Sequence, residues 1–230
     1  SQAIGNDSDN ALAFVLRADA YVRTKQFANA LADFSSAIRI EPENARWLNS
    51  RGYFLLTRGR RRDAIKDFDA AIVLKGDYAE AHNNRGLAHV GGQDYEQAIK
   101  DFNAAIAARN MFADAWNNRG FAHFRSGDYQ TAIQDFNKAI ECNPDFAMAY
   151  NNRALLRMDR KEYRQAVADC TEAIKRDGDN PRYYHFRRQA YRKLGRAEEA
   201  LADGQRLTWL LKLRQLNQQI AEAPAHSSSY

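Results

Sequence analysis

The stretch Asn83-Asn84-Arg85-Gly86 recurs at residues 117–120, and the closely similar Asn-Asn-Arg-Ala follows at residues 151–154. Each copy begins 34 residues after the one before it. A constant interval of this length is typical of chains built from stacked copies of one small supersecondary structure. The interval therefore predicts an array of similar repeats and not a single closed core.

Six repeats of 34 residues tile the chain when each starts seven residues before its Gly or the equivalent residue. We number them 1 to 6, and we count positions within each repeat from its first residue. The repeats span residues 11–44, 45–78, 79–112, 113–146, 147–180 and 181–214. Residues 1–10 and 224–230 are expected to be disordered tails, and 215–223 a helical extension that caps the last repeat.

Small and apolar residues recur at helical spacing within every repeat. Position 20 is alanine in all six repeats, position 24 is Phe in the first four, and position 8 is Gly or Ala in the first five. Positions 4, 8 and 11 form one apolar stripe, and positions 20, 24 and 27 form a second. A breaker such as Gly127-Asp128 separates the two stripes. Each repeat is therefore predicted to be two amphipathic helices joined by a short turn.

This pattern resembles the tetratricopeptide repeat (TPR) family, whose repeats carry Trp, Gly, Ala, Phe and Pro at fixed positions. Repeat 4 has all of them, as Trp116, Gly120, Ala132, Phe136 and Pro144. The resemblance covers residues 11–214. It implies an all-α, right-handed α-α superhelix (solenoid) of six helix hairpins, in which the first helix of each repeat lines a concave face. The leucine usual at position 7 is arginine in all six repeats.

An arginine at position 7 is matched by an aspartate at position 23 in every repeat. In an antiparallel hairpin the two positions lie at similar heights, so the guanidinium can meet the carboxylate bidentately. We favour a structural ladder of helix–helix ion pairs over an electrostatic surface for a ligand, because each pair neutralises its own charge. The sequence leaves open whether each Arg pairs within its own repeat or with the preceding one.

Positions 5 and 6 form a column of asparagines on the first helices of repeats 3 to 5: Asn83, Asn84, Asn117, Asn118, Asn151 and Asn152. Side-chain amides match the donors and acceptors of a peptide backbone. The family resemblance implies that these positions, with positions 9 and 12, face a peptide-binding groove. The candidate apolar anchors of that groove are Tyr53, Leu87, Phe121, Phe124 and Met158. The alternative is that the amides bridge neighbouring helices.

Repeat 6 carries nine Lys and Arg against three Asp and Glu, in a chain of formal net charge +5. Its Arg182, Arg187, Arg188 and Arg192 are a candidate patch for an acidic partner segment. The central repeats have no continuous basic track, so nucleic-acid binding is not expected. Positions 5 and 6 contain no Lys or Arg, which argues against the carboxylate clamp of TPR co-chaperones.

No catalytic motif, phosphate loop or metal-ligand spacing occurs in the sequence, so we expect no enzyme activity, no cofactor and no metal site. Cys142 and Cys170 are interpreted as small buried hydrophobes and not as a disulfide. The chain has no run of 18 apolar residues, which predicts no membrane span. The compartment stays open between the cytoplasm and the periplasm or exterior.

Near the C-terminus, Trp209, Leu213, Leu216 and Ile220 make one apolar stripe of a predicted helix. We interpret the stripe as a cap over repeat 6, with dimerisation or docking as the alternative. The predicted function is a non-catalytic scaffold for protein–protein interaction that holds an extended peptide or a helix in its groove. The alternative is a homo-oligomer in which repeat 6 of one copy stacks on repeat 1 of the next.

Overall fold

The computed structural model describes residues 10–222, which form twelve α-helices and no β-strand. The chain divides after Asp128 into an N-terminal and a C-terminal part. The N-terminal part contains α2 (Ala11–Arg23), α3 (Phe27–Ile40), α4 (Ala45–Thr57), α5 (Arg61–Leu74), α6 (Ala79–Gly91), α7 (Tyr95–Ala108) and α8 (Ala113–Ser126). The C-terminal part contains α9 (Tyr129–Cys142), α10 (Ala147–Asp159), α11 (Tyr163–Arg176), α12 (Pro181–Lys193) and α13 (Ala197–Glu222).

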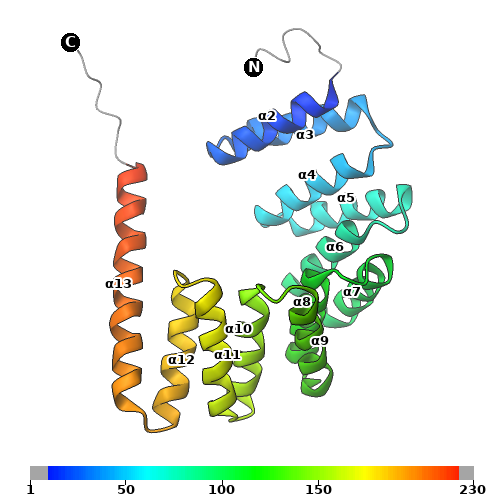
Figure 1. The fold of residues 1–230 in the computed structure, drawn as a ribbon. Coiled ribbons are helices and arrows are strands. Elements are labelled where there is room, and N and C mark those ends of the chain that lie inside the picture. Colours follow the sequence, from blue (N-terminus) through cyan, green and yellow to red (C-terminus); the bar gives the residue numbers. More distant parts are fainter. Residues whose placement is uncertain (1–9, 223–230) are drawn as a thin grey trace, which may run out of the picture. The chain divides into compact units, whose positions relative to one another are not determined.

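The helix boundaries follow the 34-residue period. Within the N-terminal part, α2 and α3, α4 and α5, and α6 and α7 form antiparallel pairs (Figure 1). Within the C-terminal part, α10 pairs with α11 and α12 pairs with α13. The predictions of an all-α fold and of two helices per repeat are confirmed.

A left-handed residue makes the turn inside every repeat. Position 15 has a φ between 59° and 91° in all six turns. The residues are Lys25, Gly59, Gln93, Gly127, Lys161 and Gly195. Glycine adopts this backbone without steric cost, whereas a lysine or glutamine is disfavoured there. The recurrence shows that one turn geometry closes all the hairpins, whichever residue occupies it.

The core of repeats 2 and 3 depends on a close approach between a glycine and a phenylalanine. Phe68 and Phe102, at position 24, are fully buried. A Cβ atom added to Gly52 would lie 2.7 Å from Cε1 of Phe68, and one added to Gly86 would lie 2.6 Å from Cε1 of Phe102. Real Cβ atoms do not approach ring carbons so closely, so in repeats 2 and 3 position 8 must lack a side chain for the ring to lie where it does.

Repeat 6 exchanges the large and small residues of this contact. Position 8 is Arg188 and position 24 is Gly204. A Cβ atom at Gly204 would lie 3.2 Å from Nε of Arg188, so the arginine stem occupies the space that a ring fills in repeats 2 and 3. Repeat 6 therefore departs from the sequence pattern by carrying the large residue at position 8 and the small residue at position 24.

The arginine at position 7 pairs with the aspartate of its own repeat. In repeats 1, 2, 3, 5 and 6, its guanidinium donates to both carboxylate oxygens at distances of 2.6 to 3.1 Å. The aspartates are buried, with Asp101 5% exposed and Asp169 2% exposed. The predicted ladder of helix–helix ion pairs is confirmed in these repeats.

The same arginine also reaches back to the preceding repeat. Its Nη1 atom donates to the side chain at position 25 of that repeat, at 2.5 to 3.2 Å. The five donor–acceptor pairs are Arg51–Ser35, Arg85–Asp69, Arg119–Asn103, Arg153–Asn137 and Arg187–Thr171. One guanidinium therefore joins three helices, and it fixes neighbouring hairpins to each other as well as closing its own.

The C-terminal extension is continuous with the last helix but does not cap it. Helix α13 runs for 26 residues. Leu210 is 2% exposed, whereas every described side chain from 211 to 219 is exposed, including Leu213 and Leu216. The interpretation of the stripe as a cap over repeat 6 is therefore wrong, because helical periodicity identifies an apolar face and not what covers it.

The predicted tails lie outside the described residues, apart from Asn10. This residue caps α2, and its side chain accepts a hydrogen bond from the backbone N–H of Ala13 at 3.0 Å. An Asn at this place satisfies one of the free N–H groups of the first turn. Position 10 therefore belongs to the folded array. The side chain of Ile220 also lies outside the described part.

Candidate functional site

Successive first helices of the N-terminal part flank a small open cavity of about 290 Å³ on the surface. Its walls come from α4, from α6 and from the residue before α8. They are Asn49, Ser50, Tyr53, Glu80, Asn83, Asn84 and Phe112. The structure thus brings together three of the predicted groove residues, Tyr53, Asn83 and Asn84. We call this hollow the α4/α6 cavity.

Asparagine side chains bridge the first helices of adjacent repeats. Asn84 donates from Nδ2 to Oδ1 of Asn49 at 3.0 Å, and Asn118 donates in the same way to Asn83 at 3.0 Å. In both bridges position 6 of one repeat donates to position 5 of the repeat before it. The alternative of internal bridging is therefore correct for these residues.

The asparagines at position 5 do not face the groove as free amides. Asn83 is 6% exposed, Asn117 is 1% exposed and Asn151 is 2% exposed. Asn83 lines the α4/α6 cavity but presents little surface to it, and the prediction that Asn117 and Asn151 grip a peptide is wrong, because adjacent helical residues point about 100° apart and only one of the two columns can face outward. Asn84, Asn118 and Asn152, at position 6, are half-buried and keep part of their surface exposed.

One of these buried amides has an unsatisfied acceptor. Oδ1 of Asn151 is buried without a hydrogen-bond partner. The observed bridges would place its donor at position 6 of repeat 6, but that residue is Phe186. An orphaned buried acceptor costs about 1–3 kcal/mol. The ladder of amides therefore does not continue into repeat 6, because the side chain of Phe186 has no hydrogen-bond donor.

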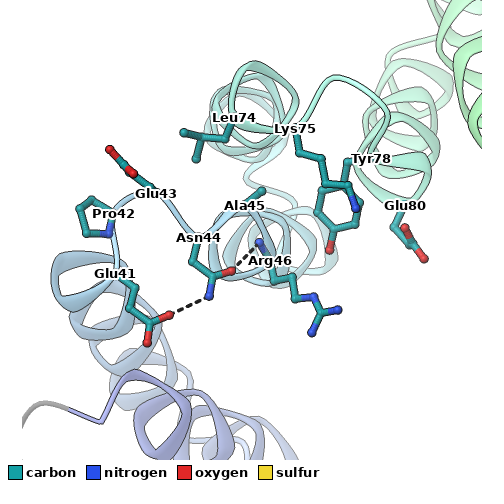
Figure 2. Close-up of a pocket in the computed structure, with 10 residues that line it drawn as sticks. All are labelled: Glu41, Pro42, Glu43, Asn44, Ala45, Arg46, Leu74, Lys75, Tyr78 and Glu80. Atoms are coloured by element: carbon teal, nitrogen blue, oxygen red, sulfur yellow. Dashed lines mark hydrogen bonds between the residues drawn. The ribbon is translucent and has the colours of Figure 1, made fainter.

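A larger concavity of about 1140 Å³ adjoins the α4/α6 cavity and shares Glu80 with it. It lies at the turns that precede α4 and α6, and we call it the turn cavity. Its lining residues are Glu41, Pro42, Glu43, Asn44, Ala45, Arg46, Leu74, Lys75, Tyr78 and Glu80. Figure 2 shows the Arg46 guanidinium and the Glu80 carboxylate projecting from α4 and α6 on either side of the Tyr78 ring in this view.

Some of the charged side chains around the turn cavity already have partners. Glu41 accepts hydrogen bonds from Asn44 at 2.7 Å, drawn in Figure 2, and from Trp47 at 2.8 Å, and these bonds lower the pKa of Glu41. Glu80 pairs with Arg109 at 2.9 Å. Arg46 forms no ion pair with any described residue, and it is exposed. The turn cavity therefore presents two exposed cations to a negatively charged group, Arg46 and Lys75, of which Lys75 lies 5.4 Å from the centre of the Tyr78 ring.

The pKa of Tyr78 is raised, chiefly by its burial and then by Glu80, while Arg46 opposes the shift. The phenol therefore stays neutral over the physiological range. A neutral hydroxyl donates one hydrogen bond and accepts others. Tyr78 can accordingly serve as a polar contact between the two cavities without adding charge.

The predicted apolar anchors differ in exposure. Tyr53 is 52% exposed at the mouth of the α4/α6 cavity. Leu87 is half-buried against a core cluster. The rings of Phe121 and Phe124 contact each other edge to face with centroids 6.5 Å apart. Met158, in the C-terminal part, is half-buried. Tyr53 therefore offers the largest fraction of its side chain to a partner.

Sequence reasoning missed Phe112, because it lies in a turn and not on a first helix. The guanidinium of Arg109 stacks 3.8 Å from the centre of its ring. The same guanidinium pairs with Glu80, so a short chain of contacts holds Phe112 at the cavity. The signal was present as an aromatic residue at position 34 of three successive repeats, Tyr78, Phe112 and Phe146.

The candidate basic patch of repeat 6 contains two arginines that serve the fold. Arg187 donates to Asp203 at 2.7 and 2.9 Å, and its side chain is 17% exposed. Arg188 packs against Gly204. The prediction that Arg187 contacts an acidic partner is therefore wrong, since its charge is already neutralised. Arg182 and Arg192 are exposed and remain candidates.

Behind the α4/α6 cavity, two imidazoles approach Asp101, the partner of Arg85. Nδ1 of His82 lies 3.9 Å from one carboxylate oxygen, and Nε2 of His89 lies 3.8 Å from the other. The interaction with Asp101 raises the pKa of His82, against the opposing effect of burial. Burial would raise the pKa of Asp101, but its contacts with His82 and Arg85 outweigh that effect and lower it.

The described residues contain neither a metal-binding cluster nor a membrane-spanning helix. In residues 10–222, no group of three or more His, Cys, Asp or Glu side chains is placed to hold a metal ion. Among the helices of that range, none combines the length and the apolar character needed to cross a membrane. Cys170 is buried, as interpreted from the sequence, whereas Cys142 is only half-buried.

The sequence matches family models described as tetratricopeptide repeat at residues 1–45, 15–79, 113–146 and 136–168, and as TPR repeat at residues 92–127. The chain is a tetratricopeptide repeat protein. TPR proteins bind protein or peptide partners and are generally non-catalytic scaffolds. No curated protein matches the TPR chain.

Solved structures share the fold of this TPR protein. PilW, described as a widely conserved type IV pilus biogenesis factor, has a TM-score of 0.77 at 19% identity, over 93% of this chain and 95% of its own. MamA has a TM-score of 0.61 at 25% identity, over 70% and 94%. YrrB, described as a TPR protein with an unusual peptide-binding site, has a TM-score of 0.58 at 17% identity, over 80% and 95%.

Proposed function

We propose that this TPR protein is a non-catalytic interaction module that holds an extended segment of a partner protein along α4 and α6. The observation that carries the proposal is the α4/α6 cavity, in which two half-buried amides lie beside an exposed tyrosine. The adjoining turn cavity extends the same surface toward Arg46. YrrB, a neighbour in fold, is described as having a peptide-binding site, which agrees with this use of the fold.

The amides supply hydrogen bonds that do not depend on the partner's sequence. The bridge between Asn84 and Asn49 uses one N–H of Asn84 and the carbonyl oxygen of Asn49. It leaves available the carbonyl oxygen of Asn84 and part of the NH₂ group of Asn49, which also hydrogen-bonds to Tyr78. These groups match the N–H and C=O of an extended backbone. The bridge also restricts the rotation of both side chains, which lowers the entropy lost on binding.

Selectivity comes from the residues on either side of the amides. Tyr53 and Phe112 provide aromatic surface for an apolar side chain, and aromatic residues often dominate the energy of such contacts. Arg46 provides a cation for an acidic side chain or a terminal carboxylate. The proposed partner segment is therefore extended, with an apolar residue near Tyr53 and a negative group near Arg46.

The buried titratable groups support a non-catalytic role. His82 and His89 lie against Asp101 within a structural ion pair. Burial raises the pKa of Cys170 to about 12, so its thiol stays protonated and unreactive at neutral pH. None of these groups lines the α4/α6 cavity. The one carboxylate that does line it, Glu80, is paired with Arg109, and the other lining groups are suited to recognition.

Selection from a random-sequence peptide library displayed on phage tests the proposal. A synthetic peptide from the selected pool is titrated against the wild type and Tyr53→Ala, with fluorescence anisotropy as the readout. We expect Tyr53→Ala to weaken binding about tenfold or more, as for the aromatic centre of an interface. The Asn84→Ala variant should weaken it less, because the amide of Asn49 remains.

Val73→Ala is the matched control, since Val73 is 86% exposed and lies outside both cavities. Thermal melts of all variants establish that they are folded before affinities are compared. Equal affinity of the selected peptides for the wild type and Tyr53→Ala would overturn the proposal, as would a library that yields no peptide sensitive to Tyr53.

A further inference from the structure

Repeats inside the array join through one recurring interface. Repeats 2, 5 and 6 carry at least one larger residue at positions 3 and 10 of the first helix, whereas repeats 3 and 4 present alanines at both positions to the second helix of the preceding repeat. In α6 these are Ala81 and Ala88, which are fully buried in clusters with residues of α5. In α8 they are Ala115 and Ala122, which are fully buried in clusters with residues of α7.

The facing surface on the second helix consists of positions 21, 25 and 28. In α7, positions 21 and 28 are Ile99 and Ile106, which pack with the alanines of α8. Position 25 between them is Asn103, which accepts a hydrogen bond from Nη1 of Arg119 at 2.6 Å. Along this face of α7, Ile99 and Ile106 therefore each pack with an alanine of α8, and Asn103 between them accepts a hydrogen bond from the arginine.

The first helix of the array presents its half of this interface without a partner among residues 10–222. Ala13 is half-buried and Ala20 is exposed, unlike their fully buried equivalents in α6 and α8. Arg17 donates from Nε and Nη2 to Asp33, as the arginines of the other repeats do. Its Nη1, the atom that donates to position 25 at the internal interfaces, makes no hydrogen bond to a described residue.

The last helix presents the complementary half. Positions 21, 25 and 28 of repeat 6 are Leu201, Gln205 and Thr208, and Leu201 is 64% exposed. A cavity of about 480 Å³ lies over this face of α13. Its lining residues are Arg188, Leu201, Gly204, Gln205, Thr208, Trp209 and Lys212. Gln205 stands at position 25, where the side chain of each earlier repeat accepts a hydrogen bond from the arginine of the next repeat.

We propose that the face of α13 formed by Leu201, Gln205 and Thr208 binds α2 of a second copy of this chain. Ala13 and Ala20 of the second copy pack on α13, and Arg17 donates from Nη1 to Gln205. The contact continues the established repeat interface from one molecule to the next. Because it joins two different faces, it is heterologous and adds copies head to tail. It leaves the α4/α6 cavity uninvolved, so it is independent of the proposed peptide binding.

Two variants, each with one face blocked, test this arrangement. Ala20→Glu blocks the α2 face and Leu201→Glu blocks the α13 face, both at exposed positions where the fold tolerates a charge. Leu216→Glu, on α13 but outside the face, is the control. Sedimentation velocity up to about 1 mM protein covers the range of weak self-association, and thermal melts check folding.

We expect the wild type and Leu216→Glu to form species that grow with concentration beyond a dimer. Ala20→Glu and Leu201→Glu should each remain monomeric alone, and an equimolar mixture of the two should form a heterodimer and nothing larger. A monomeric wild type at about 1 mM overturns the proposal, and so does a mixture that stays monomeric. A dimer that survives Ala20→Glu but is lost in Leu216→Glu also overturns it, because that result indicates symmetric pairing of α13.

A change at Gln205 tests the proposal by strengthening the self-association. Position 25 of repeat 2 is Asp69, which pairs with Arg85 at 2.7 Å. Gln205→Asp should therefore tighten self-association, by up to about fivefold for an exposed ion pair, and Gln205→Lys should weaken it. Equal association of the two variants would show that no arginine reaches this position.

Discussion

Repeat 3 and repeat 6 have the same hairpin but hold it together with different contacts. In repeat 3 a glycine accommodates Phe102, and Asn84 bridges to the repeat before. Repeat 6 has Arg188 against Gly204, and Phe186 in place of the bridging amide. Both repeats keep the arginine that joins its own aspartate to position 25 of the preceding repeat. The arginine network is therefore the constant part of the architecture, and the other contacts can be exchanged.

The largest expected effect is the loss of an aspartate from this network. Asp101→Ala leaves the half-buried guanidinium of Arg85 without its bidentate partner, and it should destabilise the protein by about 3 kcal/mol, at the low end for breaking a buried ion pair. Chemical denaturation measures the change. Lys100→Ala is the control, since its pair with Glu96 is exposed and contributes at most about 1 kcal/mol. Similar losses for the two variants would contradict a structural role for the network.

A smaller effect separates the glycines of the two repeats. Gly86→Ala places a Cβ 2.6 Å from the ring of Phe102, and should cost about 1–2 kcal/mol after the gain in helix propensity is subtracted. Gly204→Ala meets only the far end of a flexible side chain, at Nε and Cζ of Arg188, so it should be neutral or stabilising by up to about 1 kcal/mol. Thermal melts of the two variants test the contrast, which fails if both lower the melting temperature equally.

The orphaned amide of repeat 5 offers a change of about 1 kcal/mol. Phe186→Asn supplies the donor that Oδ1 of Asn151 lacks, whereas Phe186→Ala removes the ring without supplying one. We expect the Asn variant to be more stable than the Ala variant by about 1 kcal/mol, the net value of a typical hydrogen bond. Denaturant titrations of both provide the comparison, and a less stable Asn variant would show that the ladder cannot be extended.

The smallest expected effect is a pH dependence in repeat 3. Because Asp101 raises the pKa of His82 above its ordinary value of 6.5, the protonated form stabilises the fold below that pH. The contribution disappears as the pH rises through the raised pKa. The stability difference between the wild type and His82→Asn should therefore favour the wild type more at about pH 6 than at about pH 8. The opposite trend in melts at the two pH values would show that His82 is neutral in the fold.

The periodicity in the sequence was enough to predict the hairpins and the arginine–aspartate pairs, because these depend on residues that recur in every repeat. It left open which repeat supplies the aspartate, since each arginine from repeat 2 on has an aspartate 16 residues after it and another 18 residues before it. The acceptor at position 25 was missed, although polar residues occupy it in all six repeats.

The wrong predictions concern which part of the molecule covers a given helix face. Asn83, Asn117 and Asn151 were expected in the groove, but positions 5 and 6 point in different directions and only position 6 keeps exposed surface. The stripe through Leu213 and Leu216 was expected to cap repeat 6 and is exposed. Helical spacing shows which residues share a face, whereas the neighbour of that face depends on tertiary packing.

The most direct test of the account is an NMR titration of the wild type with the library-selected peptide, followed through the side-chain amides of asparagine. The account predicts that the NH₂ resonances of Asn49 and Asn84 and the backbone signal of Tyr53 shift most, while signals around Val73 stay in place. Shifts concentrated elsewhere, with Asn84 unchanged, would contradict the assignment of the α4/α6 cavity as the binding surface.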